Sequence, residues 1–356
     1  MSAPRRILIF QTAFLGDIVL TLPLAQVLKQ ECPECSISFV VIPAAASVLE
    51  GHPAVHEVIV YDKKKTQRGP AAAYRLSRAL RDREFDVALV PHRSLRSALI
   101  VAAARIPRRI GFDTSAGRAL LTDRVTYRRD AHEIDRDLAL LDPLGFHTSS
   151  GDILPALHPL PRDREAVDAL LHAHHERVAG FDAGMMVALA PGSVWKTKRW
   201  PEEKFFTLAR SLQEAGLDLA LVGGPEDRVL CGRIAGGLRR VPLNAAGELS
   251  PLQSAELIRR CRVLVSNDSA PAHLAMGVGT PVVAMFGATV PAFGFGPRGP
   301  LDRVIETMGL SCRPCSIHGG QRCPIETFDC MERITPDTVH DAAVQLARRP
   351  NPPVGG

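Results

Sequence analysis

Residues 263–286 read VLVSNDSAPAHLAMGVGTPVVAMF, which is an apolar run, a polar turn, a short helical segment and a second apolar run. Val263–Val265 and Pro281–Phe286 have the length and apolar character of buried strands. Between them, Pro271–Met276 is predicted to be a short helix, because proline suits the first helical turn. A strand, a helix and another strand in this order predict a parallel βαβ unit.

The same alternation extends along the chain. Further strands are predicted at Arg6–Phe10, Ser36–Ile42, Val55–Tyr61, Val87–Val90, Ile110–Phe112, Met185–Ala190 and Leu217–Val222. Helices are predicted from Asp17 onward and at Pro201–Ala215, Ser254–Arg260 and Pro336–Arg348. The sequence therefore predicts an α/β fold with two doubly wound, Rossmann-like halves that enclose a cleft. We expect an N-terminal domain at residues 1–178, a C-terminal domain at 179–335, and a final helix and tail at 336–356.

The overall composition excludes several classes of protein. The 356 residues are 46% hydrophobic with a net charge of +5, which is unlike a disordered chain. The longest stretch without a charged residue, Ser269–Pro297, is interrupted by prolines and glycines, so no membrane helix is expected. Only Ile7–Phe10 follow Arg5 and Arg6 before a polar residue, which is too short for a signal peptide. We therefore expect a cytosolic protein without a disulfide framework.

The positive charge is confined to the first half of the chain. Residues 1–150 contain 21 Lys and Arg against 16 Asp and Glu, a net +5, whereas residues 151–356 contain 22 of each kind. The densest basic group has no acid within it: Arg93, Arg96, Arg105, Arg108 and Arg109. Such a group favours an anionic partner, and a solvated face is the alternative. Nucleic acid is not expected, because no aromatic residues interleave these arginines.

The first candidate motif, residues 12–17, joins the first strand to the first helix. Gly16 permits a tight turn, and Asp17 lies where the helix begins. One interpretation is a carboxylate that caps the helix, worth about 1 kcal/mol. The other is a general base directed into the cleft.

The second motif, residues 190–201, also follows a strand and precedes a helix. Gly192 and Ser193 offer backbone and hydroxyl donors, while Lys198 and Arg199 place positive charge at a helix start. Cations oppose the helix dipole at that position, so their presence indicates a bound anion such as phosphate. A solvated basic loop is the alternative.

The third motif is the polar turn within 263–286. Asp268 or Ser269 is suited to cap the following helix, and the amides from Ala270 onward are suited to face a diphosphate. His273 lies within hydrogen-bonding reach of a phosphate in the same interpretation. Capping alone explains neither His273 nor the long uncharged stretch that follows.

The fourth motif, residues 223–227, contains a glycine pair and Glu226 after a strand, where a ligand or a plain turn would both fit. No G-x-x-x-x-G-K-[ST] loop occurs, which disfavours a P-loop NTPase. One G-x-G-x-x-G string, residues 294–299, contains a proline and opens no predicted helix, so it lacks the context of a dinucleotide site.

A group of cysteines lies near the C-terminus, at Cys312, Cys315, Cys323 and Cys330. Four thiols that begin with C-x-x-C are compatible with a structural zinc site. Transient disulfides and inert packing are the alternatives.

Together these motifs resemble glycosyltransferase family 9, the ADP-heptose:lipopolysaccharide heptosyltransferases, and in particular the heptosyltransferase II subfamily. The similar segments are Leu15–Asp17 with Thr21–Pro23, Pro191–Gly192 with Lys198–Pro201, Ser266–His273 with Gly279–Pro281, and the cysteine-rich segment. The resemblance implies a GT-B fold in which the last helix crosses back to the first domain. It implies transfer of heptose from ADP-heptose to the lipopolysaccharide inner core, with inversion and without a required cofactor or metal.

The resemblance also implies roles for individual residues. Asp17 would be the base, Lys198 would bind the diphosphate, and Gly192 and Ser193 would lie beside it. Asp268, Ser269, Ala270 and His273 would hold the heptose and the diphosphate, and Glu226 the nucleoside. The five arginines would suit a phosphorylated core acceptor at the inner face of the inner membrane, where the enzyme would be peripheral.

Two other functions remain open at this point. A nucleotide-sugar epimerase of similar fold would act on the sugar alone and would need no basic acceptor face. A non-catalytic nucleotide-binding scaffold would keep its function when Asp17 is replaced by asparagine.

Overall fold

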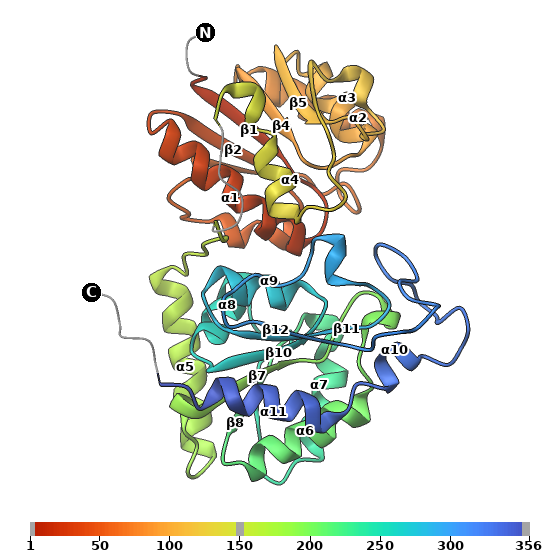
Figure 1. The fold of residues 1–356 in the computed structure, drawn as a ribbon. Coiled ribbons are helices and arrows are strands. Elements are labelled where there is room, and N and C mark those ends of the chain that lie inside the picture. Colours follow the sequence, from red (N-terminus) through yellow and green to blue (C-terminus); the bar gives the residue numbers. More distant parts are fainter. Residues whose placement is uncertain (1–3, 147–152, 351–356) are drawn as a thin grey trace. The chain divides into compact units, whose positions relative to one another are not determined.

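The protein, seen in a computed structural model that describes residues 4–146 and 153–350, divides into two compact units, Met1–His158 and Pro159–Gly356. Each unit contains one six-stranded parallel sheet with helices on its faces (Figure 1). The predicted α/β fold with two doubly wound halves is therefore confirmed.

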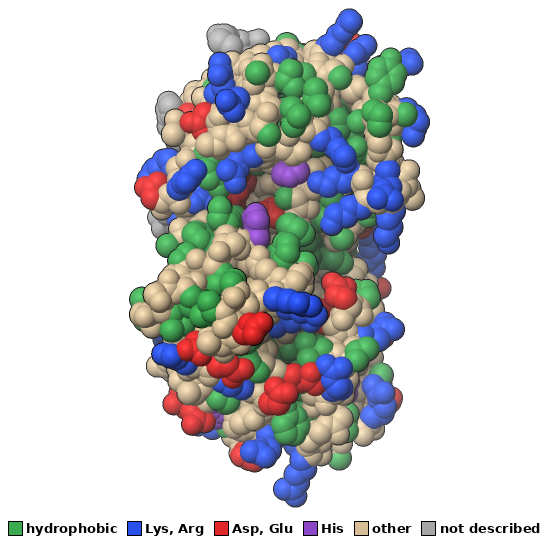
Figure 2. All heavy atoms as spheres, turned by 90° about the vertical axis from the view of Figure 1, so that its right-hand side faces the viewer, with side chains coloured by type: hydrophobic (Ala, Val, Ile, Leu, Met, Phe, Trp, Pro, Cys, Tyr) green, Lys and Arg blue, Asp and Glu red, His purple; other side chains and the backbone are tan. Residues whose placement is uncertain are grey.

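The first unit has the strand order β3-β2-β1-β4-β5-β6. The strands are β1 Arg6–Phe10, β2 Ser36–Val41, β3 Glu57–Val60, β4 Val87–Val90, β5 Arg108–Phe112 and β6 Asp123–Val125. The helices are α1 Leu15–Glu31, α2 Gly69–Arg81, α3 Leu95–Ala103 and α4 Glu133–Ala139. Helices α2 and α3 cover one face of the sheet, where Leu80 and Ile100 pack on Leu8 and Val90, and α1 packs against α4. The face of the unit that Figure 2 shows carries many lysines and arginines.

The second unit has the strand order β12-β11-β10-β7-β8-β9. The strands are β7 Met186–Ala190, β8 Asp218–Leu221, β9 Leu243–Asn244, β10 Val263–Asn267, β11 Val282–Phe286 and β12 Arg303–Glu306. The helices are α5 Pro161–Arg177, α6 Glu202–Glu214, α7 Arg228–Gly236, α8 Pro251–Arg259, α9 Ala270–Gly277, α10 Asp329–Glu332 and α11 Pro336–Ala347. Strands β7 and β10 are central and completely buried, as expected for continuous apolar runs in a parallel sheet.

The boundary between the units lies earlier than the predicted division at residues 178 and 179. Helix α5 belongs to the second unit because it packs against α8, and Asp168 on α5 forms an ion pair with Arg260 at 2.9 Å. The polar, exposed character of α5 made it look like a connecting segment.

The last helix also differs from its predicted place. Helix α11 belongs to the second unit, where Val339 and Ala343 pack in one core with Val187, Phe205 and Val263. Its apolar stripe is therefore buried within that unit, instead of crossing back to the first one. The predicted tail at 351–356 lies outside the described residues.

Three strands escaped prediction, and each lies at an edge of its sheet: β6, β9 and β12. They are short and partly exposed, so they lack the apolar runs by which the central strands were recognised. Among the described residues, no helix is long and apolar enough to cross a membrane.

Candidate active site

The loops that follow β7, β8 and β10 contain the second, fourth and third predicted motifs. These strands are neighbours in a parallel sheet, so their carboxyl ends lie at one edge. This is the edge at which open α/β sheets bind ligands. The second unit therefore gathers three separate predicted motifs around one site.

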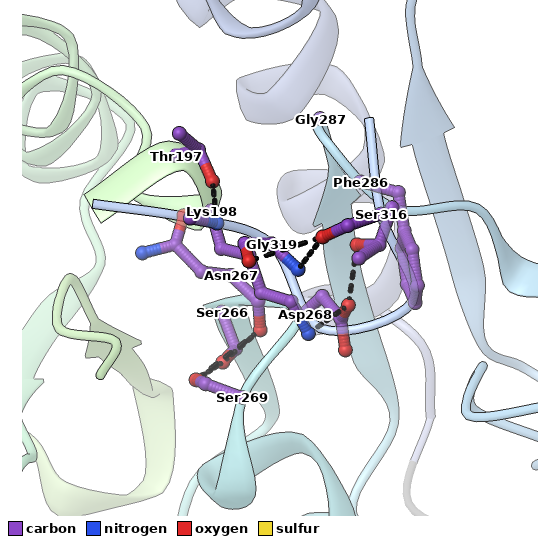
Figure 3. Close-up of polar contacts among 12 residues, drawn as sticks. Thr197, Lys198, Ser266, Asn267, Asp268, Ser269, Phe286, Gly287, Ser316 and Gly319 are labelled. Carbon is purple, nitrogen blue, oxygen red and sulfur yellow. Dashed lines mark hydrogen bonds and ion pairs between the residues drawn. The ribbon is translucent and has the colours of Figure 1, made fainter. Parts of the chain in front are cut away.

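Lys198 and Asp268 form the central ion pair of this site. The Lys198 Nζ lies 2.6 Å from Asp268 Oδ2, with side-chain exposures of only 13% and 6% (Figure 3). The Thr289 hydroxyl, which follows β11, donates to the same carboxylate oxygen at 2.6 Å. A buried pair of this kind holds a positive charge at a defined place, since the carboxylate and the hydroxyl restrict the ammonium group.

Asn267 fixes the loop that contains Lys198 to the end of β10. Its side-chain oxygen accepts from the Trp200 amide at 3.0 Å, and its Nδ2 donates to the Pro191 carbonyl at 2.9 Å. Asn267 is completely buried, so these bonds replace the water that would otherwise satisfy the amide. The residue thus joins the second and third motifs, a role that sequence spacing did not predict.

His273 faces the same site from the first turns of α9. It is buried, and its Nδ1 has no hydrogen-bond partner among the described residues. Burial lowers the pKa of the imidazole to about 4. The nearby Asp268 carboxylate acts to raise this pKa, and the Lys198 ammonium acts to lower it. His273 is therefore neutral at pH 7 and offers one N–H donor and one acceptor.

Ser269 is the residue that precedes α9, but its side chain makes no capping hydrogen bond to the helix. Its hydroxyl instead donates to the Asn267 carbonyl at 3.4 Å and lies 3.4 Å from the Ser266 hydroxyl. The prediction that Asp268 or Ser269 caps this helix is therefore wrong, because Asp268 is engaged by Lys198 and Thr289.

The side chain of Asp227 fills the space that a Cβ would need at the glycines of the second and fourth motifs. Asp227 is buried, and a Cβ on Gly192 would lie 2.1 Å from its Oδ1, while a Cβ on Gly223 would lie 2.8 Å from its Cβ. Burial raises the pKa of Asp227, although the Gly224 amide donates to it at 3.1 Å. Glu226, the residue that the resemblance indicated, is exposed beside it. Asp227 was missed because its spacing resembles a plain turn.

The cysteine-rich segment forms hydrogen bonds with the loop that contains Lys198. The Thr197 amide donates to the Gly320 carbonyl at 3.0 Å, and the Gly320 amide donates to the Thr197 hydroxyl at 2.7 Å. Gly319 has a φ of +84°, and a Cβ there would lie 3.2 Å from Lys198 Cγ. Arg313 anchors the segment by donating to the Thr289 carbonyl at 2.8 Å and to Glu306 at 2.5 Å. The segment therefore restricts the loop that contains Lys198 and the residue Thr289, both of which contact Asp268.

A zinc site, transient disulfides and inert packing were the three interpretations of the four cysteines of this segment. Among the described residues, no group of three or more His, Cys, Asp or Glu side chains is arranged to hold a metal ion. All four thiols are free. Burial raises the pKa of Cys330 to about 11, so this thiol stays protonated at neutral pH.

In the first unit, Asp17 occupies the start of α1. The helix begins at Leu15, so Asp17 is not the N-cap residue that one alternative predicted; as the third residue of the helix, its carboxylate accepts from the amide of the N-cap residue Phe14 at 2.9 Å. The side chain is half-buried, so capping does not remove it from contact with solvent or a ligand.

A buried polar group lies beneath Asp17. The Thr21 hydroxyl lies 2.8 Å from the Asp17 carbonyl oxygen and 2.6 Å from Asp137 Oδ2, and the Gln11 amide donates to it at 3.2 Å. Asp137 is completely buried, and its other oxygen has no partner among the described residues. Burial raises the pKa of Asp137 well above its usual range, with further contributions from Glu133 and Asp17. A protonated Asp137 also satisfies Thr21, which has only one hydrogen to donate.

The five predicted acceptor-binding arginines do not form one cluster. Arg93 and Arg96 follow β4 at the carboxyl edge of the sheet, whereas Arg105, Arg108 and Arg109 come at the end of α3 and the start of β5, at the opposite edge. Arg108 pairs with Asp123 at 3.1 Å, and Arg109 donates to the Leu120 and Ile106 carbonyls at 2.8 and 2.6 Å. The single basic cluster read from the sequence is thus corrected, because α3 separates the two halves.

Other polar side chains join Arg93 and Arg96 at the carboxyl edge. Lys63 Nζ donates to the Thr12 hydroxyl at 3.3 Å, and this hydroxyl lies 3.1 Å from His92 Nδ1. Burial lowers the pKa of Lys63, and nearby Arg96 and Lys64 lower it further. Burial lowers the pKa of His92 to about 4. Thr12 and His92 follow the neighbouring strands β1 and β4, and this placement after two buried strands is the sequence signal that could have indicated them.

Two doubly wound units of this kind are the components of the GT-B architecture. A family model for glycosyltransferase family 9 (heptosyltransferase) matches residues 73–323. The chain belongs to this family.

Known proteins agree with this assignment. The chain is 28% identical over 296 residues to lipooligosaccharide heptosyltransferase 2 of Haemophilus ducreyi, with 81% of this chain and 85% of that protein covered. A solved structure of a family 9 glycosyltransferase from Veillonella parvula has a TM-score of 0.85 at 25% identity and 98% coverage of both chains. Escherichia coli ADP-heptose lps heptosyltransferase II has a TM-score of 0.77 at 23% identity, with 96% and 98% covered.

Proposed function

We propose that this protein transfers a heptose from ADP-heptose to the inner core of lipopolysaccharide at the cytosolic face of the inner membrane. The observation that carries the proposal is the Lys198–Asp268 pair beside the start of α9, in a chain of family 9. The second unit takes the donor, and the first unit takes the acceptor. The heptosyltransferase 2 relatives support this substrate class.

Lys198 binds the donor diphosphate in this proposal. The ammonium is paired with Asp268, two residues before α9, and Ser269 leaves the first amides of this helix without a side-chain cap. A phosphate at Ala270 would receive backbone N–H groups and the favourable end of the helix dipole. Gly192 and Ser193 lie in the same loop as Lys198 and offer backbone N–H donors to the diphosphate, and Asp268 accepts from the heptose hydroxyls.

Two further residues complete the donor site. His273, being neutral, donates a hydrogen bond to a phosphate oxygen without adding charge. Glu226, exposed beyond the glycine pair, accepts from the ribose hydroxyls of ADP. Asp227 acts by positioning, because its carboxylate packs against Gly192 and Gly223 and so sets the backbone near the nucleotide.

Asp17 acts as the general base. It takes the proton of the acceptor hydroxyl, whose oxygen forms a bond to the anomeric carbon as the bond from that carbon to the phosphate oxygen breaks. ADP leaves with the bonding pair, and attack from the opposite face inverts the anomeric centre. Lys198 and the α9 amides neutralise the leaving charge, so this chain's own groups supply the stabilisation that a metal would otherwise give.

Arg93, Arg96 and Lys63 bind the anionic groups of the acceptor. They lie at the carboxyl edge of the first sheet, the same edge as the loop that contains Asp17. The side chain of Arg93 stacks on Tyr127 at 3.9 Å, which restricts its motion. Arg105, Arg108 and Arg109 have no place in this acceptor site, because they lie at the other edge.

The test is a donor screen with several nucleotide sugars on a core acceptor, read by release of the nucleoside diphosphate. Asp17→Asn should lower turnover more than about a hundredfold while folding and ADP binding persist, since asparagine can still accept from the Phe14 amide. Unchanged turnover in this variant would remove Asp17 from the role of base. Turnover of a donor without an acceptor would favour an epimerase, which no observation on this chain supports.

A further inference from the structure

The outer face of α2 and α3 in the first unit exposes large apolar side chains. Tyr74 is 60% exposed, Leu95 48% and Leu99 49%. Leu95 and Leu99 are one helical turn apart, so they lie on the same side of α3. Soluble proteins bury such side chains where they can, and a group of them at the surface indicates a contact with another body.

Helix α2 and the segment that leads into it are strongly basic. From residue 63 to residue 81 there are seven cationic side chains and no acid: Lys63, Lys64, Lys65, Arg68, Arg75, Arg78 and Arg81. Acids resume at Asp82, and two further cations, Arg93 and Arg96, then lie just before and within the start of α3. The first unit, seen in the upper half of Figure 2, shows lysines and arginines interspersed with hydrophobic side chains.

Contacts between the segments make this one continuous surface. Helices α2 and α3 pack side by side on the sheet, and Arg81 at the end of α2 donates to the Ala103 carbonyl at the end of α3 at 2.5 Å. At the other end, the Lys64 ammonium lies 5.7 Å from the centre of the Phe14 ring. On α2 the exposed Tyr74 thus lies next to Arg75, and on α3 the exposed Leu95 and Leu99 lie next to Arg96.

We propose that the outer face of α2 and α3 docks the enzyme on a bilayer that contains anionic lipid. Basic side chains are attracted to the negative headgroups, while Tyr74, Leu95 and Leu99 enter the region between headgroups and acyl chains. A soluble phosphorylated sugar would satisfy the charges but would leave these apolar groups in water. The inference rests on the proposed function in one respect: docking would bring Asp17 to an acceptor that is anchored in the lipid bilayer.

The first experiment measures co-sedimentation of the full chain with phosphatidylcholine vesicles, with and without phosphatidylglycerol. Binding should require the anionic lipid and weaken with salt. Arg75→Glu with Arg78→Glu should reduce vesicle binding about thirtyfold, at about fivefold for each basic side chain removed. Arg210→Glu with Arg239→Glu, two exposed arginines of the second unit, is the matched control and should bind normally.

A second pair of variants separates apolar insertion from charge. The double variant Tyr74→Ser with Leu99→Ser keeps every charge, so at low salt it should still bind anionic vesicles. At higher salt, where wild type remains partly bound through its apolar side chains, the variant should no longer bind. The proposal is overturned if wild type ignores anionic vesicles, if the control pair loses as much binding as Arg75 and Arg78, or if the protein prefers nucleic acid to vesicles.

Activity then distinguishes failure of docking from failure of the proposed function. With a deacylated, water-soluble core acceptor, the Tyr74/Leu99 variant should turn over like wild type. With the same acceptor embedded in anionic vesicles, its turnover should fall together with binding. Equal turnover on both acceptors would refute docking by this face, whereas no turnover by wild type on either would refute the enzymatic proposal and leave the vesicle result standing.

Discussion

Replacement of Lys198 by methionine should destabilise the second unit and weaken ADP binding by separate mechanisms. The 2.6 Å pair is largely buried, so its loss leaves Asp268 with the Thr289 hydroxyl as its remaining strong partner. Breaking a buried ion pair by removing one member costs about 3–5 kcal/mol, and we expect about 3 because Thr289 remains. For a unit of this size, that lowers the melting temperature by about 6–12 °C.

Nucleotide binding should respond independently of stability. A hydrogen bond from a charged group is worth about 1.5–3 kcal/mol, so ADP affinity should fall about 10- to 150-fold in Lys198→Met. The double variant Lys198→Met with Asp268→Asn removes the unpaired charge, so most of the stability should return, whereas ADP affinity should not.

Calorimetry of unfolding and titration with ADP measure the two effects. Lys196→Met is the matched control, because Lys196 lies in the same short turn but is exposed. The reasoning is refuted if Lys198→Met melts like wild type, or if the double variant recovers ADP affinity along with stability.

Two other predictions concern groups that the sequence did not single out. The pKa of Asp137 is higher in the folded protein than in the unfolded chain, where it is about 3.8. In wild type, the contribution of Asp137 to the free energy of unfolding is therefore complete below about pH 3.8. This contribution becomes smaller as pH rises toward the pKa of the folded protein. Asp137→Asn should therefore show a flatter profile of unfolding free energy in denaturant titrations at several pH values; parallel profiles would show that Asp137 is ionised. Gly319→Ala should cost about 1–2 kcal/mol for its positive φ and also weaken ADP binding, since the new Cβ meets Lys198. Gly309→Ala has the same strain with no atom within 4 Å, so it should leave ADP binding intact, and equal losses in both would contradict this role of the cysteine-rich segment.

The central strands and the loops of the donor site could be predicted from the sequence alone. A buried parallel strand must be apolar along its length, so Arg6–Phe10 and Val87–Val90 were recognised with the bounds that the structure has. Strand carboxyl ends gather at one edge, so the loops containing Ser193 and Asp268 were expected to meet. Local pattern and βαβ connection rules suffice for such features, because both act within a few tens of residues.

Partners across the fold were not accessible in that way. Thr21 and Asp137 are separated by 116 positions, and Thr197 and Gly320 by 123, so only packing brings each pair together. Arg96 and Arg108, close neighbours in the chain, end at opposite edges of one sheet because a helix runs between them. Sequence describes which groups are present and how each short segment folds; long-range packing then determines which of them share a site, since contact energies depend on distance in space and not along the chain.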